Sequence, residues 1–103
     1  MHRGIDIATN YGNPVWTTAD GTVVSTSFDK IGGRTIKINH GLYQTVYCHL
    51  SKYLVKPGQK VKRGAIIGEI GQTGRAKGPH VHYEVRVNGK RVNPYNFILE
   101  EDY

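Results

Sequence analysis

The stretch PHVHYEVRVNGKRV, residues 79–92, combines a strand pattern, a turn signal and two closely spaced histidines. Its first half alternates between polar and apolar residues, as a strand with one buried face does. The Asn88-Gly89 pair then favours a tight hairpin turn onto a second strand. Side chains two positions apart on a strand share one face and lie about 6.5–7 Å apart along the chain. His80 and His82 are therefore placed to share one metal ion, or one metal ion and its bound water.

Short strands and turns of the same kind continue through the whole chain. It contains 13 glycines, and tyrosine supplies 7 of its aromatic residues against 2 phenylalanines and 1 tryptophan. No helical periodicity runs beyond a few residues, which favours an all-β fold. A length of 103 residues supports one domain with one modest core. We expect an antiparallel β-sandwich or a small antiparallel barrel, with strands over residues 15–17, 22–26, 34–38, 44–50, 65–70, 81–87 and 90–92.

Charge and cysteine content exclude several classes of protein. The formal net charge of +6 favours polyanionic surroundings, which could be nucleic acid, anionic lipid or an acidic cell-wall polymer. The basic residues are scattered and are not interleaved with aromatic ones, so we expect no specific nucleic-acid binding. No apolar run is long enough for a transmembrane segment. The single cysteine, Cys48, cannot form an intramolecular disulfide, so a metal site is the available cross-link for so small a domain.

Further candidate metal ligands lie far from the histidine pair in sequence. His2 and Asp6 place an imidazole and a carboxylate four residues apart, with a glycine between them. Zinc binds nitrogen and oxygen ligands at about 2.0–2.2 Å, and a catalytic zinc keeps three protein ligands and one open position. His2, Asp6 and one histidine of the 80/82 pair would form such a set. The other histidine of the pair, with His49, would serve proton transfer beside the metal.

Three other residues are assigned to supporting positions. His40 sits beside a glycine at the end of an expected strand and is interpreted as a hydrogen-bonded turn histidine. Cys48 is expected on the face opposite His49, so it should pack in the core or a wall. Each metal-binding imidazole needs a carboxylate or carbonyl behind it to fix its tautomer. Glu84 is the candidate by position.

Three sequence blocks resemble the signature of the LytM/lysostaphin-type zinc metallopeptidases. They are HRGIDIA at residues 2–8, TVYCHLS at 45–51, and GQTG at 71–74 leading to GPHVHYE at 78–84. The similarity runs from His2 to about Phe97 in the family's order and spacing, and KVKRGAIIG at 60–68 resembles its duplicated hybrid motif. Members of this family are bacterial cell-wall endopeptidases with a β-sandwich core.

The resemblance implies a role for each of five residues. It makes His2, Asp6 and His82 the ligands of one Zn²⁺ per chain, and His49 and His80 the catalytic pair. In the family's mechanism, zinc polarises the scissile carbonyl and activates a water molecule. The two histidines assist as general base and as stabilisers of the tetrahedral oxyanion. The implied substrate is the peptide of peptidoglycan, in cross-links or stems, at the bacterial envelope (periplasm or cell surface) or outside the cell.

Two other functions compete with this one. A non-catalytic scaffold of the same fold would activate a separate cell-wall hydrolase, but such members have usually lost ligands and all five positions are filled here. A lipoyl- or biotinyl-type carrier or a sugar-phosphotransfer domain is suggested by residues 55–68. A carrier needs a lysine at a hairpin tip beside a methionine, and Met1 is the only methionine. We expect residues 1–103 to form one LytM-type domain that lacks its N-terminal strand and upstream regions; the oligomeric state and the cleaved bond stay open.

Overall fold

Short antiparallel strands make up the part of the chain that the computed structural model describes. That part covers residues 4–74 and 76–93, and the side chains of Ile5 and Asp6 lie outside the description. Within it there is no helix, and so none of the length and hydropathy needed to span a bilayer. The strands are β1 Ile5–Ala8, β2 Pro14–Trp16, β3 Gly21–Asp29, β4 Gly33–Asn39, β5 Gln44–Tyr53, β6 Lys60–Val61, β7 Ile66–Ile70, β8 His80–Val87 and β9 Lys90–Val92.

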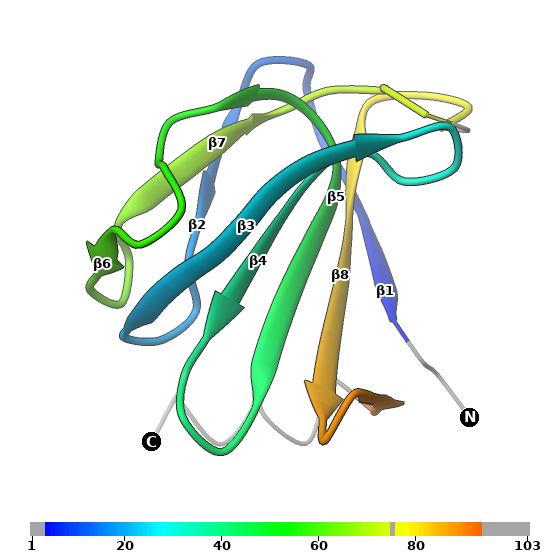
Figure 1. The fold of residues 1–103 in the computed structure, drawn as a ribbon. Coiled ribbons are helices and arrows are strands. Elements are labelled where there is room, and N and C mark those ends of the chain that lie inside the picture. Colours follow the sequence, from blue (N-terminus) through cyan, green and yellow to red (C-terminus); the bar gives the residue numbers. More distant parts are fainter. Residues whose placement is uncertain (1–3, 75, 94–103) are drawn as a thin grey trace.

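The strands pair into one continuous sheet. Its main path runs β1-β8-β5-β4-β3-β6, while β7 pairs with both β5 and β2, and β9 pairs with β8. Every pairing is antiparallel. Figure 1 shows this sheet curled into a half-barrel. The expected all-β antiparallel fold is confirmed. Of the two expected forms, the barrel-like one describes the structure better, because a single sheet curls on itself (Figure 1).

The core follows the alternation seen in the sequence. On β4, Ile36 and Ile38 are fully buried, whereas their neighbours Thr35 and Lys37 are not. Burying an aliphatic side chain of this size stabilises a fold by about 1.5–3 kcal/mol. The other fully or almost fully buried side chains join them in one core cluster, among them Val23, Tyr47, Leu50, Ile67, Ile70, Tyr83 and Val85.

The hairpin between β8 and β9 forms as the sequence predicts. Asn88 and Gly89 have φ values of +52° and +78°. A two-residue turn with both φ values positive matches the twist of the strands on either side. The turn sets Arg91 directly opposite Arg86 and Val92 opposite Val85.

Strand β5 changes its partner at His49. Residues Gln44 to Cys48 pair with β8, and residues from Leu50 onwards pair with β7. Along its other edge, β5 has two residues, Cys48 and His49, between paired positions where β4 has one, Thr35. The extra residue is a β-bulge, a feature that redirects side chains next to functional sites.

Candidate active site

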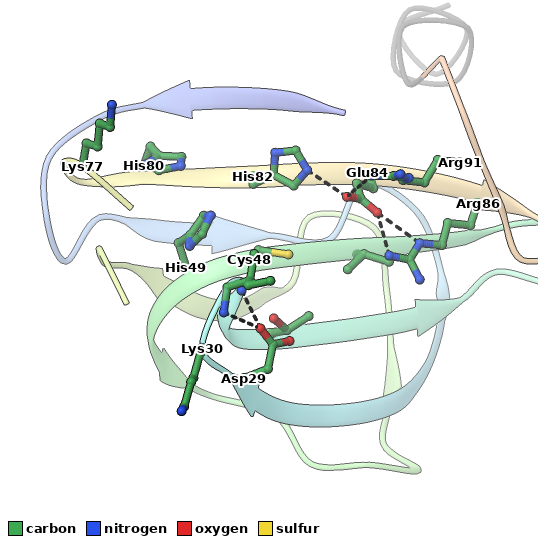
Figure 2. A pocket seen from close by; sticks show the side chains of 14 residues that line it. Asp29, Lys30, Cys48, His49, Lys77, His80, His82, Glu84, Arg86 and Arg91 are labelled. Carbon is green, nitrogen blue, oxygen red and sulfur yellow. Dashed lines mark hydrogen bonds and ion pairs between the residues drawn. The ribbon is translucent and has the colours of Figure 1, made fainter. Parts of the chain in front are cut away.

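One face of β8 carries a row of polar side chains that lines a groove of about 840 Å³. These side chains occupy every second position and therefore share one face: His80, His82, Glu84 and Arg86. The residues between them face the core: Val81, Tyr83 and Val85. Figure 2 shows the row along β8, with His49 facing it from β5. The structure thus brings together three of the predicted site residues, His49, His80 and His82.

His49 reaches the groove because its backbone departs from a regular strand. Its φ is +66°, in the left-handed region, and its N–H donates a hydrogen bond to the carbonyl of Gly32 at 2.7 Å. Left-handed backbone is uncommon for residues other than glycine and is found at functional sites. The His49 ring centroid lies 4.7 Å from that of His80 and 6.4 Å from that of His82.

The same bulge corrects the prediction for Cys48. Strict alternation would place Cys48 and His49 on opposite faces, yet both line the groove, because the additional residue interrupts the alternation. Cys48 lies directly opposite His82 and is buried, so it forms part of the groove floor. Burial raises the pKa of its thiol. A protonated, buried thiol is a packing group, as the sequence suggested, and a poor nucleophile.

The rings of His49 and His80 are held in the same way. His49 Nδ1 lies 2.7 Å from the carbonyl oxygen of Thr73, and His80 Nδ1 lies 2.9 Å from that of Gly78. A carbonyl oxygen only accepts hydrogen bonds, so Nδ1 carries the hydrogen in both rings. In the neutral form of each ring, Nε2 is therefore the basic nitrogen.

Thr73 is a supporting residue that the sequence prediction missed. Besides the bond to His49, its hydroxyl donates to the carbonyl of Leu50 at 2.7 Å and accepts from the N–H of Arg34 at 3.0 Å. Gly33, at φ +66°, packs directly against it, and any Cβ there would overlap Thr73. A Cβ on Gly74 would likewise overlap the backbone of Gly33. The glycines of the GQTG block were the available signal, because they permit this close packing of two loops.

His82 is held by a buried carboxylate. Its Nε2 lies 2.9 Å from Glu84 Oε2, and Glu84 Oε1 accepts from Arg86 Nε at 3.0 Å and from Arg86 Nη2 at 2.8 Å. Burial alone would raise the pKa of Glu84, but the bonds from His82 and Arg86 lower it to about 2. An ionised carboxylate accepts the Nε2 hydrogen, so the neutral His82 ring presents Nδ1 as its electron-pair donor. Glu84, proposed from position alone, does stand behind His82.

Only one of the three predicted metal ligands has a described side chain. His2 lies outside the described residues, as does the side chain of Asp6. Among the residues that are described, no group of three or more His, Cys, Asp or Glu could hold a metal ion. The backbone register nevertheless places Asp6 directly opposite His82 on the neighbouring strand.

Gly4 adds a second observation that fits a metal site at this point. A Cβ on Gly4 would lie 2.6 Å from Cε1 and 2.7 Å from Nε2 of the His82 ring. The glycine between His2 and Asp6 therefore leaves the space that the His82 ring occupies. His82 offers a nitrogen donor whose tautomer is fixed, and Asp6, a residue with a carboxylate, lies directly opposite it on the neighbouring strand. Nitrogen and oxygen ligands of this kind are the ones that zinc accepts.

Replacing Gly4 by alanine is expected to weaken zinc binding by about tenfold or more. The added methyl group must displace the His82 ring, which breaks its bond to Glu84 and releases the orientation of Nδ1. Gly78→Ala is the matched control, because a Cβ at Gly78 meets no atom within 4 Å. Competition with a chromophoric chelator measures both affinities. Equal zinc affinity in the two variants would show that Gly4 does not shape the site.

His40 lies outside the groove and behaves as predicted. Its Nδ1 is 2.7 Å from the carbonyl oxygen of Asp20, and its Nε2 is 2.7 Å from the Thr45 hydroxyl. Its ring also stacks on Tyr43 with centroids 4.8 Å apart. Both ring nitrogens thus serve the turn, which confirms a structural histidine.

The sequence matches the profile of Peptidase family M23 over residues 1–94. The chain belongs to peptidase family M23. Peptidoglycan DD-endopeptidase ShyA of Vibrio cholerae is 53% identical over 93 residues, which are 89% of this chain and 22% of that protein. The family resemblance that the three sequence blocks indicated is thereby confirmed.

Solved structures of M23 relatives share the fold. The catalytic domain of lysostaphin from Staphylococcus simulans matches with a TM-score of 0.90 and 38% identity, covering 96% of this chain and 80% of that one. A zinc-containing peptidase from Vibrio cholerae matches with a TM-score of 0.85 and 47% identity, covering 88% of this chain and 28% of that one. The similarity to the zinc-containing peptidase supports zinc as the metal of the M23 site. The chain spans 21 to 23% of the length of the first curated relatives it matches.

Proposed function

We propose that this M23 domain is a zinc-dependent endopeptidase that hydrolyses peptide bonds in peptidoglycan cross-links or stem peptides. His2, Asp6 and His82 would hold one zinc ion per chain, and His49 and His80 would carry the proton transfers. The observation that carries this proposal is the matched pair of rings, His49 and His80. Their ring centroids lie 4.7 Å apart, and both rings have the same tautomer. Beside them, Glu84 fixes the ring of His82. Packing alone does not require three imidazoles to be oriented in this way.

Zinc, when bound, supplies Lewis acidity toward the scissile carbonyl and toward water. Nε2 of His49 or His80 accepts the proton of the attacking water, since neutral imidazole is basic near pH 7. The same nitrogen then returns the proton to the leaving amine. The other ring, donating from Nε2 in its protonated form, stabilises negative charge on the carbonyl oxygen. Thr73 and Gly78 keep both rings in the orientation that these steps need.

The substrate assignment rests on relatives and on charge. Two relatives are named peptidoglycan DD-endopeptidases, and these names give peptidoglycan as their substrate. The net charge of +6 on this chain suits an anionic envelope. A location at the bacterial envelope or outside the cell follows from that substrate. A scaffold without catalysis would have no use for the tautomers of His49 and His80.

Digestion of purified sacculi, with mass analysis of the released peptides, tests this function. The zinc-loaded chain is expected to release cleaved cross-links or stems, and metal analysis to give one zinc per chain. His82→Ala is expected to lose both the zinc and the cleavage, because it removes a ligand. Retention of zinc by His82→Ala would contradict the ligand assignment. A zinc-loaded chain that cleaves nothing, yet stimulates a separate hydrolase, would establish the scaffold function instead.

A further inference from the structure

An arginine at one end of the groove has no hydrogen-bond partner for its side chain among the residues that the structure describes. Arg91 lies opposite Arg86 across the β8–β9 hairpin and lines the same groove as Glu84 and His82. Its side chain is 48% exposed. Among the described residues, its one polar contact joins Nη1 to Glu84 Oε2 at 3.9 Å, which is longer than a hydrogen bond. Figure 2 shows Arg91 beyond Glu84 as seen from His82.

Glu84 does not need Arg91 to balance its charge. Oε1 already accepts two N–H bonds from Arg86, and Oε2 accepts the bond from His82. The forked contact with Arg86 is the strong form of a guanidinium–carboxylate pair. The positive charge of Arg91 is therefore not neutralised by the contacts among His82, Glu84 and Arg86.

Asp29 is the other acidic residue among the described residues that line the groove, and its carboxylate is also occupied. Asp29 Oδ1 accepts the N–H groups of Ile31 at 2.8 Å and Gly32 at 2.6 Å, in a turn of the groove wall. Lys30 and Lys77 add positive charge at the opposite end. The described walls of the groove thus favour a negatively charged ligand, and Arg91 is the cation nearest to Glu84 whose donors are not engaged at hydrogen-bond distance.

We propose that Arg91 binds a carboxylate of the peptide substrate, on the residue whose amine is released. This inference rests on the proposed function. The planar guanidinium presents paired N–H donors that match the two oxygens of a carboxylate. In a cross-link between D-alanine and the D-centre of diaminopimelate, the carbon that bears the scissile nitrogen also bears a free carboxylate.

The position of Arg91 suits a carboxylate close to the scissile bond. Arg91 Nη1 and His82 Nε2 both approach the same oxygen, Glu84 Oε2. Glu84 is one strand repeat from His82, about 6.5–7 Å, which an extended peptide covers in two residues. A carboxylate held by Arg91 therefore belongs to a residue within two positions of the bond held near His82, and the residue next to that bond satisfies this limit.

Two synthetic cross-linked peptides test the inference. One carries the free carboxylate next to the D-alanyl amide bond, and the other carries a primary carboxamide at that position. Binding of both is measured by calorimetry with His49→Ala as the common background, so that neither is cleaved. Arg91 is expected to favour the free acid by about tenfold, and Arg91→Gln to remove that preference. Lys90→Gln, an exposed neighbour in β9, is the control and should keep it.

The outcomes separate this inference from the proposed function. The role of Arg91 would be overturned if the protein that keeps Arg91 bound both peptides with equal affinity. It would also be overturned if the preference for the free acid persisted in Arg91→Gln. An equal loss of affinity for both peptides in Arg91→Gln would also overturn it, because that pattern indicates support of Glu84. Cleavage of the free-acid peptide by the chain with His49 intact tests the endopeptidase activity independently. Zinc content of Arg91→Gln should be unchanged.

Discussion

Replacing His49 or His80 by alanine is expected to lower kcat by about 10²- to 10⁴-fold while the zinc content stays at one per chain. Each ring is fixed by a backbone carbonyl at Nδ1, which leaves Nε2 to exchange protons with the substrate. Neither Nδ1 contact involves His82 or Glu84, so removing one ring leaves the network behind His82 in place. The measurement is the initial rate on a cross-linked peptide, together with metal analysis of the same sample.

The control for these variants is another histidine of the chain. His40→Ala removes a ring that bonds Asp20 and Thr45 away from the groove, so it should lower stability but leave kcat within a few-fold. Loss of zinc together with activity in His49→Ala would contradict the division between metal ligands and proton carriers. Unchanged kcat in both His49→Ala and His80→Ala would remove the catalytic role of the pair.

Much of the fold could be predicted because one face of each strand is buried. The alternation at residues 34–38 and 81–87 reports directly which side chains enter the core, and Asn88-Gly89 specifies its own turn. The two-residue strand β6 carries too little pattern to be recognised. Its pairing, Gly21 with Val61 and Thr22 with Lys60, depends on contacts between distant parts of the chain.

The site was predictable where strand geometry alone determines it. His80 and His82 share a face because they are two positions apart, and Glu84 extends the same row. His49 was placed beside the metal as part of the histidine constellation and again by the family resemblance, although alternation continued from the buried Tyr47 would turn it toward the core. Its actual position depends on a bulge and a left-handed φ, which the Gly32 carbonyl supports. Such local departures depend on the packing of two loops, which no periodicity in the sequence reveals.

Replacing Glu84 by alanine is expected to weaken zinc binding by about 10- to 100-fold, the usual effect of removing a carboxylate behind a metal-binding histidine. Without Glu84, the His82 ring loses the acceptor that fixes its tautomer, so either nitrogen can carry the hydrogen. Arg86 loses both of its hydrogen bonds as well. Leaving that guanidinium without its acceptor should reduce the free energy of unfolding by about 1–3 kcal/mol. Chelator competition and denaturant unfolding measure the two effects separately.

Glu84→Gln distinguishes orientation from charge, because the glutamine oxygen can still accept the hydrogen from His82 Nε2. If Glu84 acts mainly by fixing the ring, Glu84→Gln should keep most of the zinc affinity that Glu84→Ala loses. If its negative charge matters more, Glu84→Gln should lose nearly as much as Glu84→Ala. Glu69→Gln on β7, which does not line the groove, is the matched control and should bind zinc normally. Unchanged zinc affinity in Glu84→Ala would mean that the His82–Glu84–Arg86 network stabilises the sheet and does not serve the metal site.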